Sequence, residues 1–134
     1  GNDTYVFNLG DGHDTIYDYD RNYTNYSYYN AGNDTIRFGE GIDESSVAFY
    51  MNGSNLVLSY GDNDLITITN QSVTNNAIEK FTLSDGNYLT SNDINVIIQS
   101  MNAYATDHGI TIDSMDTVKN NQDLMNIVAA GWHQ

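Results

Sequence analysis

The chain has 134 residues and a mass of 14.9 kDa, which is the size of one domain with a modest core. It carries 18 acidic side chains against four basic ones, a formal net charge of −14, which excludes nucleic acid and anionic lipid as main partners. The absence of cysteine excludes disulfides and thiol catalysis, and no apolar run approaches the ~20 residues of a membrane span. The chain does not start with a basic and then an apolar stretch, so we expect no N-terminal signal peptide.

The acidity comes almost entirely from aspartate, which supplies 15 of the 18 acidic side chains. Asp, Asn and Gly favour tight turns, because Asp and Asn side chains bond the nearby backbone and all three tolerate left-handed conformations. Helical surfaces are richer in Glu, Lys and Arg. The composition therefore predicts strands and tight turns with carboxylates held on the turns, an arrangement typical of sites for hard cations such as calcium.

A short motif occurs three times near the start of the chain: Gly, any residue, Asp, Thr and a large apolar residue. These repeat units are Gly1–Tyr5, Gly12–Ile16 and Gly32–Ile36, and they start 11 and 20 residues apart. A polar, Tyr-rich insert at 21–30 separates the last two units. It shows neither strand alternation nor a helical face, so we interpret it as a loop. Its tyrosines either cover the sheet edge or offer a contact area to a partner.

The middle of the chain predicts antiparallel strands. The runs rich in β-branched and apolar residues are 47–51, 56–60, 65–69, 78–83 and 88–89. Asn52-Gly53 separates the first two runs and Asp85-Gly86 the last two, and both dipeptides are strong hairpin signals.

After Ser91 the apolar period becomes helical. The positions that follow the three-and-four spacing are Ile94, Ile97, Ile98, Met101 and Ala105. Ser91 or Asn92 is expected to cap this helix and Gly109 to end it. A second helix is predicted over 121–130, and a single helical turn over 114–118.

The three repeat units resemble the calcium-binding nonapeptide G-G-x-G-x-D-x-U-x of RTX proteins, which folds as a parallel β-roll. Gly12–Tyr17 matches the fourth to ninth positions of that motif, and Gly10 matches the second. The later segments 34–42 and 55–58 are similar to those that follow the repeats in haemolysin-type calcium-binding proteins, and 121–128 looks like the C-terminal end of large bacterial RTX exoproteins. The paired glycines of the motif are missing from all three units, so the resemblance is to the degenerate end of a roll that holds one or two ions.

The resemblance implies a mainly β fold in one domain. We expect a short degenerate parallel β-roll over 1–45, antiparallel β-hairpins over 46–90, and C-terminal α-helices over 91–134 as a cap.

The resemblance also implies which oxygen atoms hold Ca²⁺. In the resembled repeat the ion lies between turns and is held by backbone carbonyls near the glycines and by the sixth-position Asp. Carried over to this chain, the candidate ligands are the carboxylates of Asp3, Asp14 and Asp34 and the carbonyls of Gly10, Asp11, Gly12 and Gly32. The alternative is that these Asp residues only cap turns.

Four further acids are less specific. Asp18 and Asp20 stand at alternate positions like the start of an EF-hand loop, but the glycine and glutamate that such a loop needs are absent. They either close the edge of the calcium site or lie on a solvated turn. Asp62 and Asp64 flank a hairpin turn, for which ordinary turn chemistry is our interpretation.

No enzymatic motif stands out. The three histidines, at 13, 108 and 133, lack metalloprotease spacing, and the chain has neither a serine elbow nor a phosphate-binding glycine loop. We therefore expect a non-enzymatic module. The resemblance implies that it folds on calcium outside the cell and carries the C-terminal type I secretion signal of a larger exoprotein, a toxin or an adhesin.

The partners implied are calcium and the type I secretion machinery, and the location is extracellular or the bacterial cell surface. The alternative is a calcium-dependent adhesion module that binds a host glycan or protein through the Tyr-rich insert. A membrane span and nucleic-acid binding are not expected.

Overall fold

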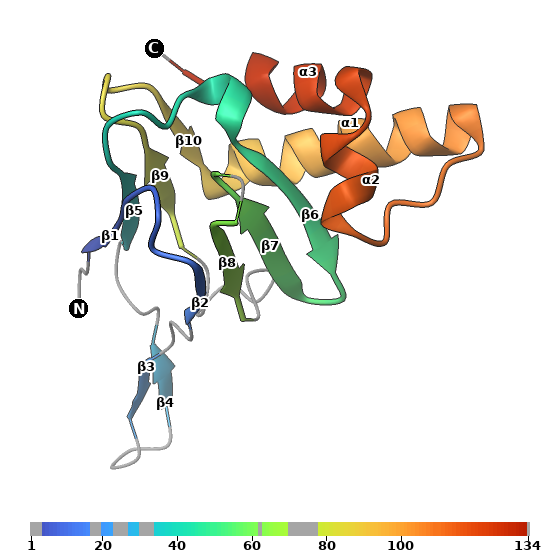
Figure 1. The fold of residues 1–134 in the computed structure, drawn as a ribbon. Helices are drawn as coiled ribbons and strands as arrows, with labels where there is room; N and C mark the ends of the chain where they lie inside the picture. Colours follow the sequence, from blue (N-terminus) through green and yellow to red (C-terminus); the bar gives the residue numbers. More distant parts are fainter. Residues whose placement is uncertain are drawn as a thin grey trace.

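The computed structural model describes residues 4–16, 20–22, 27–29, 34–61, 63–69 and 78–133. These residues form two four-stranded sheets, a separate two-stranded hairpin and three α-helices (Figure 1). Helices and strands take up comparable shares of the described chain, so the fold is mixed α/β. The expected mainly β fold is only partly confirmed, because the tail after Thr90 is largely helical.

The first sheet joins the first and third repeat units. Its order is β1-β5-β9-β10, with strands β1 (Thr4–Phe7), β5 (Thr35–Phe38), β9 (Lys80–Thr82) and β10 (Tyr88–Thr90). The first three strands are parallel, and β9 and β10 form an antiparallel hairpin. Thr4 pairs with Thr35. The Thr of the first unit therefore lies beside the Thr of the third.

The second sheet contains the second repeat unit. Its order is β2-β8-β7-β6, with strands β2 (His13–Ile16), β8 (Leu65–Ile68), β7 (Asn55–Ser59) and β6 (Ala48–Asn52). The antiparallel meander predicted from Asn52-Gly53 is confirmed for β6, β7 and β8. Strand β8 also pairs with β2 in parallel, with Thr15 beside Thr67. The middle of the chain is thus tied to the repeats through β8 and β9.

The two sheets face each other across one hydrophobic core. Tyr60 directly follows β7, and its ring centroid lies 6.0 Å from that of Phe7 and 5.4 Å from that of Phe38 on the opposite sheet. Along β5, Ile36 and Phe38 are buried while Arg37 between them is exposed, as expected for a strand with one face toward a core.

The Tyr-rich insert contains a hairpin in place of the predicted loop. Strands β3 (Asp20–Asn22) and β4 (Ser27–Tyr29) pair in antiparallel fashion, with Asp20 opposite Tyr29. Each strand has only three residues, too few for an alternation of apolar and polar residues to be recognised in the sequence. The prediction of a loop without strands is therefore wrong for this segment.

The helical tail follows the sequence prediction closely. Helix α1 (Ser91–His108) has Thr90 as its N-cap, one residue before the predicted cap, and ends at Gly109 with φ of +65°. Helix α2 (Met115–Lys119) is capped by Ser114, and α3 (Gln122–Ala130) is capped by Asn121. Since Thr, Ser and Asn side chains accept from free N–H groups at helix starts, these caps explain the helix boundaries.

The helices bury one face each in the core. Their core residues are Ile94, Ile97, Met101, Val118, Leu124 and Val128. Helix α2 packs against β6 and β7, α1 lies beside β10, and α3 contacts both α1 and the short 3₁₀ helix at Glu44–Ser46 (Figure 1). None of the described helices is long and apolar enough to cross a membrane.

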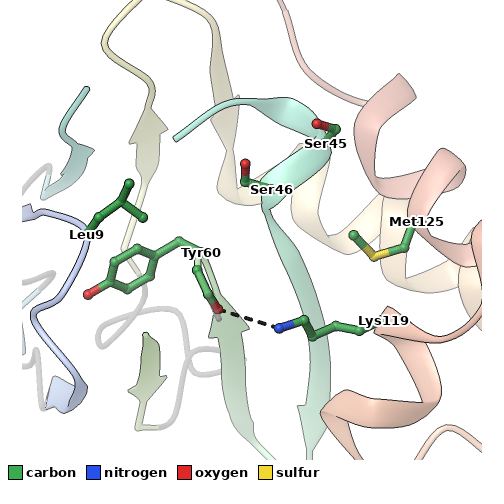
Figure 2. Close-up of a pocket in the computed structure, with 7 residues that line it drawn as sticks. Leu9, Ser45, Ser46, Tyr60, Lys119 and Met125 are labelled. Carbon is green, nitrogen blue, oxygen red and sulfur yellow. Dashed lines mark hydrogen bonds between the residues drawn. The ribbon is translucent and has the colours of Figure 1, made fainter. Parts of the chain in front are cut away.

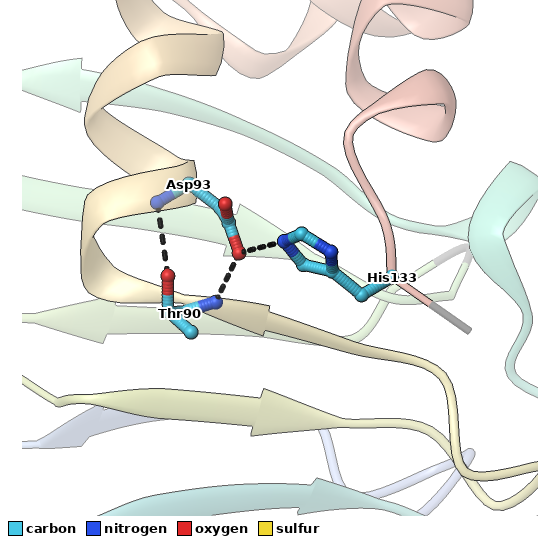
Figure 3. Close-up of polar contacts among 3 residues, drawn as sticks. All are labelled: Thr90, Asp93 and His133. Carbon is cyan, nitrogen blue, oxygen red and sulfur yellow. Dashed lines mark hydrogen bonds and ion pairs between the residues drawn. The ribbon is translucent and has the colours of Figure 1, made fainter.

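The end of the described chain is fastened to the start of α1 (Figure 3). One Asp93 carboxylate oxygen accepts from the Thr90 N–H at 2.8 Å and lies 2.8 Å from Nε2 of His133. The backbone of His133 also pairs with Tyr88 of β10. Partial burial pushes the pKa of Asp93 upward, but the hydrogen bonds from Thr90 and His133 outweigh it and hold the pKa below its usual value.

Candidate functional site

The turn between β1 and β2 has the conformation that the repeat motif requires. Gly10 and Gly12 have φ of +92° and +83°, a region that side-chain-bearing residues rarely adopt. The Asp11 carboxylate accepts from the Asn8 N–H at 2.7 Å, and the Asp11 N–H donates to the Asn8 carbonyl at 3.1 Å. The glycines predicted as part of the site therefore serve the turn.

Asp64 holds this turn from the second sheet. Its two carboxylate oxygens accept from the Gly10 N–H and the Gly12 N–H, each at 2.9 Å, across 54 and 52 residues of chain. The residue is 6% exposed, and the hydrogen bonds from Gly10 and then Gly12 lower its pKa. A side chain on Gly61 would meet the same carboxylate at 2.5 Å, so the glycine leaves room for it.

Asp64 stabilises a turn, as its interpretation as a turn residue expects, but the turn is the one at Gly10–Gly12 and not the hairpin turn that Asp64 flanks. The register that pairs Asp14 with Ile66 brings Asp64 beside Gly12. Only knowledge of that strand pairing could have identified Asp64 from the sequence.

Tyr60 lies beside the same turn. Its side chain is fully buried, and its hydroxyl has no hydrogen-bond partner among the described residues. Burial raises the pKa of Tyr60 to about 12, and the charges of Asp64, Asp11 and Asp14 add to the rise. The hydroxyl is therefore a buried polar group among acidic side chains.

A second pair of acids lies on the first sheet. Asp34 is fully buried directly before β5, and its N–H donates to a Glu79 carboxylate oxygen at 2.7 Å. Glu79 precedes β9 just as Asp34 precedes β5, since Thr35 pairs with Lys80. Burial raises the pKa of Glu79, and the negative charge of Asp34 raises it further. The hydrogen bond from the Asp34 N–H lowers the pKa, but it does not cancel the rise. No motif in the sequence identifies Glu79 as a candidate site residue.

The predicted ligands fall into two described groups. Gly10, Asp11, Gly12 and Asp14 lie at the turn and on β2, and Asp34 lies on the other sheet. Asp11 and Asp14 are exposed, and the Gly12 carbonyl accepts from the Leu65 N–H at 3.0 Å. Outside the described residues lie Asp3, Asp18, Gly32 and Asp62, and of Asp20 only the backbone is described. The predicted ligand set therefore stays a prediction.

The described oxygens can supply only part of a calcium shell. Among residues 4–16, 34–61, 63–69 and 78–133, no three acidic or histidine side chains come together as a metal-binding group. Calcium takes six to eight oxygen ligands, many of them carbonyls and waters. The donor set at the Gly10–Gly12 turn consists of oxygens alone, and the buried Tyr60 hydroxyl still needs a partner. Oxygen atoms are the ligands that a hard cation such as Ca²⁺ prefers, so these groups are chemically suited to one.

A hollow of about 400 Å³ separates this region from the helical tail (Figure 2). Its lining includes Leu9, Tyr60, Lys119 and Met125. The Lys119 amino group lies 3.5 Å from the Gly61 carbonyl, so the end of α2 is linked to the chain beside Tyr60.

The chain was compared with protein-family models. Residues 55–93 match the haemolysin-type calcium binding protein related domain. No curated protein matches the chain. The match covers β7 to the first turn of α1 and includes Asp64 and Glu79, the two acids that sequence reasoning missed. It supports a relation to haemolysin-type calcium-binding proteins and a calcium-binding role.

Proposed function

We propose that the chain is a non-enzymatic calcium-binding module whose repeat units form a short parallel β-roll that folds on binding calcium outside the cell. The observation that carries this proposal is the parallel pairing of the first and third repeat units on one sheet, while the second unit pairs in parallel with β8 on the facing sheet. Thr4 lies beside Thr35 on one sheet, and Thr15 lies beside Thr67 on the other. Stacked turns with one strand in each sheet are the arrangement that a β-roll requires.

The charge of the chain explains why a cation would matter. A net charge of −14 opposes compaction, and Asp11, Asp14 and Asp64 lie close enough to act on the same buried hydroxyl. Calcium would supply a double positive charge there, with oxygens of Asp11, Asp14 and the Gly10 carbonyl as its proposed holders. When a site does not exist in the unfolded chain, its binding free energy becomes folding free energy.

Thermal unfolding in EGTA and in millimolar calcium tests this proposal. With free calcium at about 100 times the dissociation constant, one site stabilises the fold by about 2.7 kcal/mol. We expect a higher melting temperature in calcium and little change with magnesium at the same concentration, because magnesium sheds its waters reluctantly. Equal melting temperatures in EGTA and calcium would contradict the proposal.

A pair of aspartate variants tests the location of the ion. Asp14→Ala should weaken calcium binding strongly, because it removes a proposed ligand. Asp107→Ala removes an exposed carboxylate near the end of α1 and should leave affinity unchanged. Calorimetric titration measures the calcium affinity of both variants, and equal affinities would show that Asp14 is not a calcium ligand.

We also infer that residues 91–134 carry a type I export signal of a larger secreted protein, a toxin or an adhesin. Helices α2 and α3 have 5 and 9 residues, below the ~12–15 residues at which isolated helices become populated in water. Before the sheets form, α2 and α3 would be largely unfolded and open to an exporter, whereas α1, with 18 residues, exceeds that length. Fusion of Ser91–Gln134 to a slow-folding passenger, expressed with a cognate exporter, should give secretion, and retention beside an active exporter would contradict it.

A further inference from the structure

The Tyr60 hydroxyl is a buried polar group that the fold does not use. Its side chain has no exposed surface, and the hydroxyl contacts no hydrogen-bond partner within the described chain. Buried hydroxyls are normally paired, because burial removes their hydrogen bonds to water. If the position needed only an aromatic ring, phenylalanine would fill it without that penalty.

The direction of the ring brings the hydroxyl to the repeat turn. Figure 2 shows the hydroxyl at the end of the ring that points toward Leu9 and away from Ser46 and Lys119. The backbone of Tyr60 is held in the same loop as Asp64, since the Tyr60 N–H donates to the Asp64 carbonyl at 3.1 Å. The Asp64 carboxylate in turn holds Gly10 and Gly12.

The surroundings of the hydroxyl are acidic. Asp64, Asp11 and Asp14 all lie within electrostatic range of it, and the described chain places no hydrogen bond between the phenol and any of them. A cation at this point would neutralise the negative charge of the carboxylates, and the cation or its hydration water would give the hydroxyl a partner.

We propose that Tyr60 belongs to the calcium site at the Gly10–Gly12 turn, where its hydroxyl pairs with the ion or with the ion's hydration water. This inference rests on the proposed function. It extends the site to the loop between β7 and β8, which belongs to the meander and lies outside the repeat units. Asp64 contributes by keeping the turn in place from the same loop.

Tyr60→Phe tests the inference, with Tyr50→Phe as the matched control. Tyr50 is a partly buried tyrosine of β6 that packs against the same core. Calcium titrations of the full chain are followed by calorimetry and circular dichroism. We expect Tyr60→Phe to shift the calcium midpoint upward by about tenfold or more, the effect of losing one hydrogen bond to a charged shell. Tyr50→Phe should leave the midpoint unchanged.

The stability of the calcium-free chain separates this role from a packing role. Removal of an unpaired buried hydroxyl does not destabilise a fold, so Tyr60→Phe in EGTA should unfold at the same urea concentration as the unchanged chain or at a higher one. Weaker calcium binding without weaker apo stability supports the inference. Loss of apo stability with unchanged calcium affinity would overturn it.

Terbium provides a readout that does not depend on apo folding. Tyrosines close to a bound terbium ion sensitise its luminescence, and terbium occupies calcium sites. Tyr60→Phe should lower the sensitised emission at saturation, whereas Tyr50→Phe should not. If the unchanged chain binds calcium and both variants match it in emission and midpoint, the inference fails and the proposed function stands. If the unchanged chain binds no calcium, both fail.

Discussion

Leu124→Ala tests whether the helical tail is part of the core. Leu124 is fully buried on α3, and its side chain belongs to the same hydrophobic cluster as Phe38 and Leu58 of the two sheets. Helix α3 also contacts β6 and the 3₁₀ helix at Glu44–Ser46. The tail therefore completes the core, and a cavity on α3 should destabilise the whole chain.

The expected loss is about 3 kcal/mol, since leucine-to-alanine changes at buried sites cost ~2–5 kcal/mol. For a domain of this size, each kcal/mol lowers the melting temperature by roughly 3–5 °C. Leu124→Ala should therefore melt about 10 °C lower in saturating calcium, as measured by calorimetry. The fluorescence of Trp132, the single tryptophan and itself 9% exposed in this core, should report the same transition.

Val96→Ala is the matched control. Val96 lies on α1 with 52% of its surface exposed, so its truncation should change stability by less than about 0.5 kcal/mol. If Leu124→Ala and Val96→Ala melted together, the helices would not be packed on the sheets and the reasoning would be refuted. If Trp132 fluorescence changed well before the main heat absorption, the tail would unfold as a separate unit.

Three further changes test individual contacts by urea unfolding. Asp93→Asn should lower the free energy of unfolding by about 1 kcal/mol near neutral pH. Because the pKa of Asp93 is lowered in the folded chain, this difference should shrink below about pH 4. A difference that stayed constant with pH would contradict the contact between the Asp93 carboxylate and His133. Gly12→Ala should destabilise by about 1 kcal/mol through its φ of +83° alone, since the space around it is free. Gly131→Ala should cost about 1–3 kcal/mol, because its Cβ would lie 2.2 Å from the Ile97 Cδ1; unchanged stability would show that Ile97 moves freely.

Local features of the fold could be predicted from the sequence. The hairpin at Asn52-Gly53 and the end of α1 at Gly109 each depend on a few neighbouring residues, and Gly53 and Gly109 have the positive φ that these turns require. The apolar face of α1 was visible from its period, since Ile94, Ile97 and Met101 are all buried.

Long-range pairing could not be predicted in the same way. Strand β8 pairs with β2 across about 50 residues of chain, and a strand of four residues carries no mark of its partner. The acids that depend on such pairing were missed for this reason. Asp64 reaches Gly10 only because β8 lies beside β2, and Glu79 reaches Asp34 only because β9 lies beside β5.

The two roles proposed for the tail are separable because they need different states of the chain. As a cap, the tail buries Leu124 and Val128 against the sheets and fastens His133 to β10. As an export signal it would be read before those sheets exist, when short helices are barely populated. Leu124→Ala should therefore lower the stability of the folded chain and leave the secretion of a Ser91–Gln134 fusion intact, because that fusion has no sheet to pack against. Loss of both in the same variant would mean that the exporter reads the apolar face itself.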